Sequence, residues 1–409
     1  MNRLSPARQR ADGPAPGHLA KTLTYGTIYP AAGSRGNRPG EPSTCGACTG
    51  VPDQGTLGPQ RPTRTCVLNV IIGMPIILEA VMPWNRILAG TAAGSMAGLV
   101  ALAGRYAAGV ARADREWAGQ VEAGLHDLGE VDEVSVVPLV ERLIGEGSGL
   151  RGEPGVSYLV SVGGQRVLFD SGLSGGKPDS ALAHNAQVLG VPLADLDAVV
   201  ISHLHADHVG GLRAMRQRTF TFCAGSLEPS GVPAYVPTQM GHPCADVLVT
   251  TGPRVIGRGM AVLPPLPRML FWIGYVTEQV LVVNVRGFGL VLISGCGHPR
   301  IEQILGVTER VLDVPIRAVV GGLHLPVHAA GTPLMPQAVL GNPHPPWRPI
   351  SERDAEHVLA EIEARGPKLV ALSSHDSTPW TYDAFTCRFG DRYRTLRAGE
   401  ELRITAADA

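Results

Sequence analysis

The residues best able to do chemistry lie together in the segment Ser-His-Leu-His-Ala-Asp-His-Val-Gly-Gly at positions 202–211. His203 and His205 are two residues apart in an expected extended turn, so their imidazoles point the same way and can hold one metal ion. Asp207 and His208 are displaced enough to face a second ion. Imidazole and carboxylate ligands without a thiolate suit zinc, and manganese and iron also accept them. The spacing therefore predicts a metal centre, with two zinc ions as the expected cofactor.

Short apolar strands are expected to bring this cluster and three later histidines to one place. In open α/β sheets, ligands gather at the C-terminal ends of the strands. Helices are expected near residues 181–189, 300–312 and 351–364, between the strands. The expected strands and the histidines that follow them are 198–201 with His203, the second half of 280–293 with His298, 316–320 with His324, and 368–372 with His375. The chain is therefore predicted to have an α/β fold with its site at strand ends.

At these motifs the sequence resembles the metallo-β-lactamase superfamily. The pattern His203-x-His205-x-Asp207-His208 followed by Gly-Gly is similar to its signature, and residues 168–172 are similar to the preceding strand and turn, in which Asp170 would support the metal ligands from behind. The resemblance implies an αββα sandwich with one or two metal ions between its sheets.

A closer resemblance, over residues 131–407, is to the branch that contains archaeal dihydropterin-ribofuranosylaminobenzene phosphate synthase. The motifs that resemble this branch are Asn185-Ala186, Leu189-Gly190, Glu278-Gln279, Gly295-Cys296-Gly297-His298, Gly321-Gly322-Leu323-His324 and Ser374-His375.

The resemblance also implies the remaining ligands. His298 would be the third ligand of the first metal ion, and His375 would complete the second. His324 stands where the superfamily usually has a bridging carboxylate or cysteine. An imidazole cannot easily bridge two metal ions, so His324 is expected either to bind one ion or to form hydrogen bonds beside the site. We expect Cys296 and His328 to be structural residues.

The last motif departs from the branch, which generally has His-Cys-Thr-Gly there. This chain has His375-Asp376-Ser377-Thr378. Asp376 is expected either to contact substrate or metal, or to cap a turn. Loops at residues 225–267 and 329–349 are expected to shape the substrate site, and sequence alone does not give their form.

These residues favour a metal-dependent hydrolase that acts on an ester, lactone or phosphoester of a small molecule. Paired zinc ions lower the pKa of a shared water and so provide a hydroxide nucleophile. Asp207 would orient it, and His324 would donate a proton or hold the developing charge.

Two other functions stay open. One is a transferase that joins a pterin to a phosphorylated ribosyl-aminobenzene, although Arg300 is the one basic residue near the metal motifs in sequence and this weakens a heavily phosphorylated substrate. The other is a membrane-tethered binding protein without catalysis.

Composition divides the chain of 409 residues into unlike parts. Its 51 glycines and 34 prolines exceed the usual share, and residues 1–81 are predicted to be a disordered, low-complexity extension. Cys45 and Cys48 have the spacing of half a zinc site, but no second pair follows, and the seven cysteines are expected to be mostly reduced. The net charge of -1 argues against nucleic acid as a partner and leaves a small-molecule substrate. The catalytic domain is expected at residues 131–409.

Between these parts, residues 82–115 are expected to form an apolar helix rich in Ala and Gly. Residues 87–104 are uncharged and just long enough to cross a bilayer, and counted from Met82 they also resemble a secretory signal. This interpretation predicts membrane association or export. The alternative is a helix packed on the domain of a cytoplasmic protein. The spacing of Gly90, Gly94 and Gly98 is typical of closely packed helices and favours a homodimer.

Overall fold

The computed structural model describes residues 84–120, 124–126, 128–175, 177, 179–222, 230–327 and 336–408, without the side chains of residues 84–97 and 336. The expected extension at residues 1–81, the Cys45 and Cys48 pair, the start site at Met82 and His328 lie outside the described residues. So do parts of the two loops expected to shape the substrate site.

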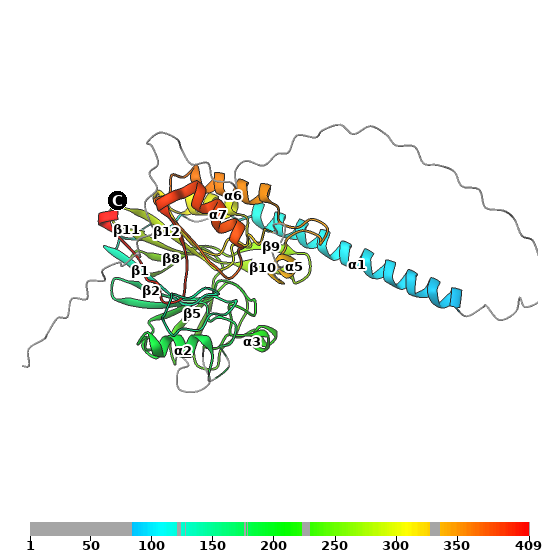
Figure 1. Ribbon diagram of the computed structural model, residues 1–409, viewed down its shortest axis with the longest axis horizontal. Helices are drawn as coiled ribbons and strands as arrows, with labels where there is room; N and C mark the ends of the chain where they lie inside the picture. Colours follow the sequence, from blue (N-terminus) through cyan, green and yellow to red (C-terminus); the bar gives the residue numbers. More distant parts are fainter. Residues whose placement is uncertain are drawn as a thin grey trace, which may run out of the picture. The chain divides into compact units, whose positions relative to one another are not determined.

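Two seven-stranded sheets form the centre of the fold (Figure 1). The first has the order β16-β1-β2-β3-β4-β5-β6, and the second has the order β15-β14-β13-β12-β11-β8-β7. The strands of the first sheet are β1 (Glu133–Val140), β2 (Ser157–Val162), β3 (Gln165–Phe169), β4 (Ala198–Val200), β5 (Pro233–Val236), β6 (Asp246–Val249) and β16 (Leu402–Thr405). Those of the second are β7 (Arg254–Gly257), β8 (Met260–Val262), β11 (Leu281–Val285), β12 (Gly289–Ser294), β13 (Ile316–Gly321), β14 (Leu369–Leu372) and β15 (Tyr393–Thr395).

Both faces of each sheet are covered. In β2, Leu159 packs toward the helices of its own side, whereas the neighbouring Val160 packs toward the opposite sheet, because successive side chains of a strand point to opposite faces. Val283 and Val291 meet Val160 from the second sheet. The central strands, such as β11 and β12, are therefore short runs of buried Val, Leu and Ile, whereas the edge strands β6 and β7 have no buried residue.

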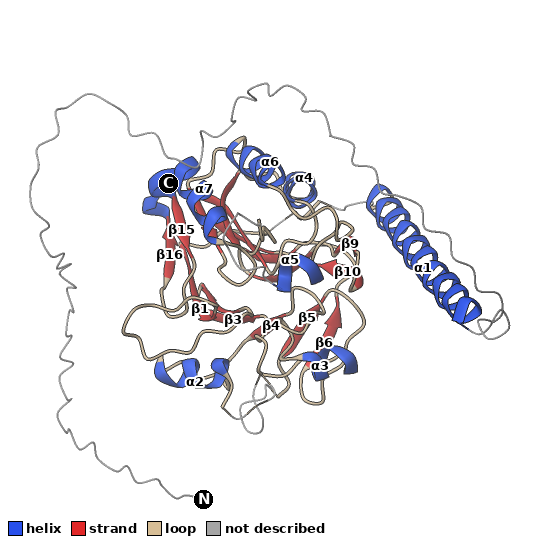
Figure 2. Ribbon diagram, turned by 45° about the vertical axis from the view of Figure 1, so that its right-hand side comes forward, coloured by secondary structure: helices blue, strands red, loops and turns tan. Residues whose placement is uncertain are grey.

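Helices complete the four layers. The first sheet is covered by α2 (Ala181–Val188) and α3 (Leu212–Gln217), and the second by α4 (Ile301–Val311), α6 (Glu352–Glu363) and α7 (Pro379–Phe389) (Figure 2). α6 begins with the expected capping box of Ser351 and Asp354. The αββα sandwich predicted from the sequence is confirmed.

The long helix α1 (Trp84–Ala118) occupies the region in which the apolar helix is expected. Its C-terminal half contacts the ribbon of β9 (Leu266–Leu270) and β10 (Gly274–Glu278). Arg105 donates to the carbonyl oxygens of Phe271 and Trp272, and the Tyr106 hydroxyl donates to that of Pro343 at 2.6 Å. No helix in the described part of the chain has the length and apolar character needed to cross a bilayer, so the predicted membrane helix at 87–104 is not supported. These contacts begin at Arg105, beyond the 87–104 run, in which Leu99 and Val100 are exposed.

Candidate metal centre

The site lies where neighbouring parallel strands end. In the second sheet, β12, β13 and β14 are parallel, with Val319 of β13 paired to Leu292 on one side and to Val370 on the other. The loops after these strands contain His298, His324 and His375. In the first sheet, β3 and β4 are parallel. Asp170 follows β3, and the 202–211 cluster follows β4. The sequence prediction that the histidines follow strand ends is therefore confirmed.

One group of candidate ligands consists of His203, His205 and His298, whose donor atoms lie within 4.8 Å of one another. Nδ1 of His205 is 3.1 Å from Nε2 of His298. His203 is fully buried, yet its Nε2 has no hydrogen-bond partner among the described residues. An unpaired buried ring nitrogen is costly unless an ion occupies the space before it. These three residues therefore fit a metal ion.

Ser202 fixes the ring of His203 in the form that a metal requires. The Ser202 hydroxyl donates to Oδ2 of Asp170 at 2.6 Å, so toward Nδ1 of His203, 2.9 Å away, it can only accept. The proton of His203 is then on Nδ1, and the lone pair of Nε2 faces the site. Asp170 thus supports a candidate ligand from behind, as the sequence indicates.

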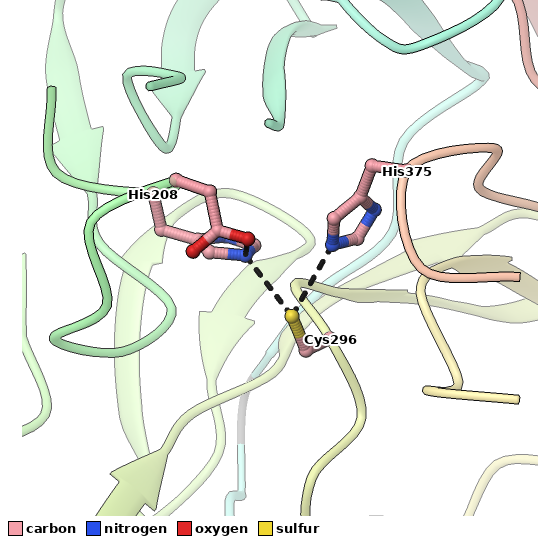
Figure 3. Close-up of side chains that lie close together, drawn as sticks. His208, Cys296 and His375 are labelled. Carbon is pink, nitrogen blue, oxygen red and sulfur yellow. Dashed lines mark hydrogen bonds and ion pairs between the residues drawn. The ribbon is translucent and has the colours of Figure 1, made fainter. Parts of the chain in front are cut away.

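A second group consists of Asp207, His208, Cys296 and His375. Nε2 of His208 lies 3.0 Å and Nε2 of His375 lies 3.2 Å from Sγ of Cys296, so the sulfur is between two imidazoles from opposite sheets (Figure 3). Asp207 is partly exposed, and its Oδ2 lies 3.8 Å from Nε2 of His208. These residues offer a complete donor set for a second ion.

His375 is held by the same arrangement as His203. The Ser373 hydroxyl donates to Oε1 of Glu141 and lies 2.6 Å from Nδ1 of His375, which places the ring proton on Nδ1 and frees Nε2. Glu141 is fully buried and also accepts from Ser374 and from the hydroxyl of Tyr158. Burial raises the pKa of Glu141. Sequence reasoning missed this glutamate, because it follows β1 and stands in none of the recognised motifs.

His208 binds Asp170 directly. Its Nδ1 is 2.8 Å from Oδ2 of Asp170, and both side chains are fully buried. Asp170 thus supports two candidate ligands. It contacts His208 directly, and it is linked to His203 through the hydroxyl of Ser202. Such carboxylates behind metal-binding histidines set the ring orientation and raise ligand basicity. Asp170 also has a positive φ of 61°, a strained backbone conformation for a non-glycine residue.

One carboxylate organises the loop that contains Cys296 and His298. Glu278, at the end of β10, is fully buried and accepts four backbone N–H groups. Its Oε1 accepts from Gly295, Cys296 and Gly297, and its Oε2 accepts from His298 at 2.8 Å. Burial raises the pKa of Glu278 to about 7. The sequence indicated Glu278 as part of a motif but gave no physical role for it.

His324 lies beside the first group and has one free ring nitrogen. Its Nε2 is 3.2 Å from the carbonyl oxygen of Gln337, which can only accept, so Nε2 bears the proton. Nδ1 is buried without a partner among the described residues, and the ring centroid is 4.8 Å from that of His298. In this tautomer His324 offers a lone pair to the site, which fits a ligand or an acceptor better than the expected proton donor.

Asp376 holds the His324 loop. Its Oδ2 accepts from the backbone N of His324 at 2.8 Å, and its Oδ1 accepts from the Ser377 hydroxyl. His324 has a positive φ of 48°, so this bond stabilises a strained turn. Among the described residues, Asp376 belongs to none of the groups of candidate ligands. The structure therefore favours the turn-stabilising alternative over a contact with substrate or metal.

Cys296 is the main departure from the expectations for the site. The sequence analysis treated it as structural, whereas the structure includes it in two groups of candidate ligands, once with His208 and His375 and once with His298 and His324. The available signal was its position two residues before His298, in a turn that must place both side chains near the strand ends.

A cavity of about 810 Å³ opens onto the candidate ligands. Its polar lining includes Asp207, His205, Cys296, His298 and His324, together with the charged residues Arg112, Glu116 and Arg218. Most of the other lining side chains are apolar, and they include Leu173, Leu204, Leu212, Met215, Ile273, Val276 and Leu340. The cavity is large enough for a drug-sized molecule with an apolar body.

Comparison with known proteins agrees with this architecture. The model of a family described as the metallo-beta-lactamase superfamily matches residues 150–221. A 7,8-dihydropterin-6-methyl-4-(beta-D-ribofuranosyl)-aminobenzene-5'-phosphate synthase of Methanocaldococcus jannaschii is 23% identical over 241 residues, which are 49% of this chain and 81% of that protein.

Solved structures are also similar to this chain. A metal-dependent hydrolase of the beta-lactamase superfamily has a TM-score of 0.47 and 23% identity, covering 66% of this chain and 99% of its own. The metallo-beta-lactamase fold protein YhfI from Bacillus subtilis has a TM-score of 0.42 and 15% identity, with coverage of 67% and 100%.

Proposed function

Because this chain belongs to the metallo-beta-lactamase superfamily, we propose that it is a metal-dependent hydrolase of an ester, lactone or phosphoester in a small molecule. The observation on which this rests is the free, buried Nε2 of His203, which faces the donor atoms of His205 and His298. The proposed cofactor is a pair of zinc ions. Such ions lower the pKa of water and so make a nucleophile available at neutral pH.

The chain's own residues have distinct tasks in this proposal. His203, His205 and His298 hold the first ion, and His208, Cys296, His375 and Asp207 hold the second. Asp207 is the partly exposed member that lines the cavity, so it is placed to orient the attacking water and accept its proton. His324 presents Nδ1 as an acceptor or ligand.

The shape of the cavity bears on the substrate. Its apolar walls would bury an apolar body, while the reactive carbonyl or phosphoryl group would lie against the imidazoles. Such walls also exclude water from the reacting bond, which strengthens the electrostatic contacts made to it.

The test combines metal analysis with an activity screen over lactones, thioesters, phosphodiesters and pterin phosphates. We expect at least one transition metal ion per chain and a turnover that His205→Ala removes. His184→Gln is the matched control, because His184 lies on α2 and its Nε2 contacts the carbonyl oxygen of Gly149 away from the site. Metal-free protein, or full turnover in His205→Ala, would overturn the proposal.

A transferase that couples a pterin to a phosphorylated ribosyl-aminobenzene is the second candidate. It is favoured by the match to the Methanocaldococcus jannaschii synthase, which spans 81% of that protein. Product analysis with a pterin diphosphate separates the two candidates. A coupled product supports the transferase, and a free alcohol supports the hydrolase.

A further inference from the structure

A second cavity, of about 300 Å³, lies behind the candidate metal centre. His298, His324 and Gly341 line both this cavity and the larger one. Its other walls come from β9, the start of α4, residues 343–350 and α6. The imidazoles of His298 and His324 therefore form part of the wall of both cavities.

Three arginines line this second cavity: Arg268, Arg300 and Arg348. Arg268 is mostly buried, and its Nε has no hydrogen-bond partner in the part of the chain that the structure describes. Burial and the neighbouring charge of Arg300 lower the pKa of Arg268. Guanidinium groups seldom remain buried without an acceptor, since an unpaired buried charge is costly.

Glu302 and Asp114 attract Arg268 electrostatically, but no carboxylate in the described part of the chain forms an ion pair with its guanidinium group. Oε1 of Glu302 lies 2.6 Å from Nε2 of His357, and Oδ2 of Asp354 accepts from the backbone and the hydroxyl of Ser351. His344 also lines the cavity, and its pKa is lowered by burial and by the charges of Arg348 and Arg268. The cavity therefore holds three guanidinium groups and two carboxylates, Glu302 and Asp354, among the described residues that line it.

The start of α4 adds to this positive potential. Arg300 is the N-cap of the helix and provides no side-chain cap, and the start of the helix lines the same cavity, so the positive end of the helix dipole contributes there. The carboxylate of Glu302 in the first turn accepts a backbone hydrogen bond and offsets part of this potential. Helix N-termini and arginines are the two features that proteins commonly combine to bind phosphate.

We propose that the second cavity binds a phosphate group of the substrate, with Arg268, Arg300 and Arg348 as its partners. The substrate class is then a phosphate monoester that has a second, hydrolysable bond near the metal centre. The inference that this second bond is hydrolysed rests on the proposed function, whereas the binding of phosphate can be measured without turnover. Three arginines line a cavity beside the candidate ligands, which corrects the expectation that Arg300 is the one basic residue near the metal motifs.

The binding test uses inorganic phosphate as the probe and calorimetry on the full chain. Because phosphate also binds metal ions, it is titrated into both the wild type and His203→Ala. We expect saturable binding in both proteins and a loss of affinity of about tenfold or more in Arg268→Gln, since a charge-assisted hydrogen bond is removed. Arg353→Gln is the control, because Arg353 is an exposed arginine on α6 that does not line the cavity. Binding lost in His203→Ala but retained in Arg268→Gln would overturn the inference.

Two further measurements keep the result interpretable. Arg348 is exposed, so Arg348→Gln keeps the core intact and should weaken phosphate binding if Arg268→Gln fails to fold. In turnover, Arg348→Gln should raise KM for a phosphorylated substrate more than KM for its dephosphorylated form. An equal rise for both forms contradicts the inference. Phosphate binding without any hydrolysis would contradict the proposed function alone.

Discussion

Nε2 of His208 lies 3.0 Å from Sγ of Cys296, which joins the first sheet to the second at the candidate metal centre. The sulfur is also close to His375, at 3.2 Å from its Nε2. Without an ion, burial raises the pKa of the Cys296 thiol well above its usual range. A bound zinc ion reverses this, because a coordinating thiol is deprotonated.

The first prediction is that Cys296→Ser lowers the affinity of the second metal site, because zinc prefers thiolate to a hydroxyl ligand. Metal content should fall from two ions toward one per chain. In cobalt-substituted protein, the wild type should show thiolate-to-metal charge-transfer absorption that the variant lacks. Cys244→Ser is the control, since Cys244 is exposed. An unchanged cobalt spectrum in Cys296→Ser would exclude the sulfur as a ligand.

The second prediction concerns the serine that orients His375. Ser373→Ala removes the hydroxyl between Glu141 and Nδ1 of His375, so the imidazole loses the contact that fixes its tautomer. We expect metal affinity to fall about 10- to 100-fold, the usual cost of losing such an outer contact. Competition with a chelator measures it.

The control for this effect is Ser148→Ala, because the Ser148 hydroxyl bonds only within its own turn, donating to the carbonyl oxygen of Gly145 and accepting from the backbone N–H of Leu150. Equal metal affinity in Ser373→Ala and the wild type would show that the Glu141 arrangement has no part in ligand positioning.

The sequence predicted the elements near the site well because each leaves a local pattern. The strand before His203 is an apolar run that ends at polar residues, and the capping box of Ser351 and Asp354 is a contiguous signal. The capping box forms between a side chain and the backbone within four residues, and the apolar run shows the burial of its own strand, so both are visible in a short segment of sequence.

Residues that depend on distant partners could not be predicted in this way. Glu141 lies more than 230 positions from Ser373, and Arg268 and Arg300 come from separate elements that line one cavity. Cys296 was expected to be structural, and only the approach of His208 and His375 to its sulfur makes it a candidate ligand. Tertiary contacts alone distinguish these residues from ordinary buried ones.

The third prediction concerns removal of the metal. Chelation should lower the free energy of unfolding, because an ion that binds only the folded chain stabilises it by about 2.7 kcal/mol at 100 times its dissociation constant. Thermal unfolding with and without added zinc measures this. His203→Ala should show a smaller zinc-dependent shift than the wild type, and an equal shift in both would place the stabilising ion elsewhere.

The fourth prediction is that displacing His324 lowers turnover without lowering metal content. Gly341 lies against the ring of His324, and a Cβ at this position would overlap the imidazole. Gly341→Ala must therefore displace His324, and a misplacement of about 1 Å in an active site can lower turnover about 100-fold. The ligands His203 and His205 come from another loop, so metal content should stay near that of the wild type.

Gly241→Ala is the matched control for this change, because a Cβ at Gly241 meets no atom within 4 Å. The kcat of the control should equal that of the wild type, while Gly341→Ala loses kcat and keeps its metal. If Gly341→Ala lost metal in proportion to activity, His324 would act as a ligand that the first ion needs. If it kept full kcat, the position of His324 would have no part in turnover, because its ring cannot remain in place beside an added methyl group.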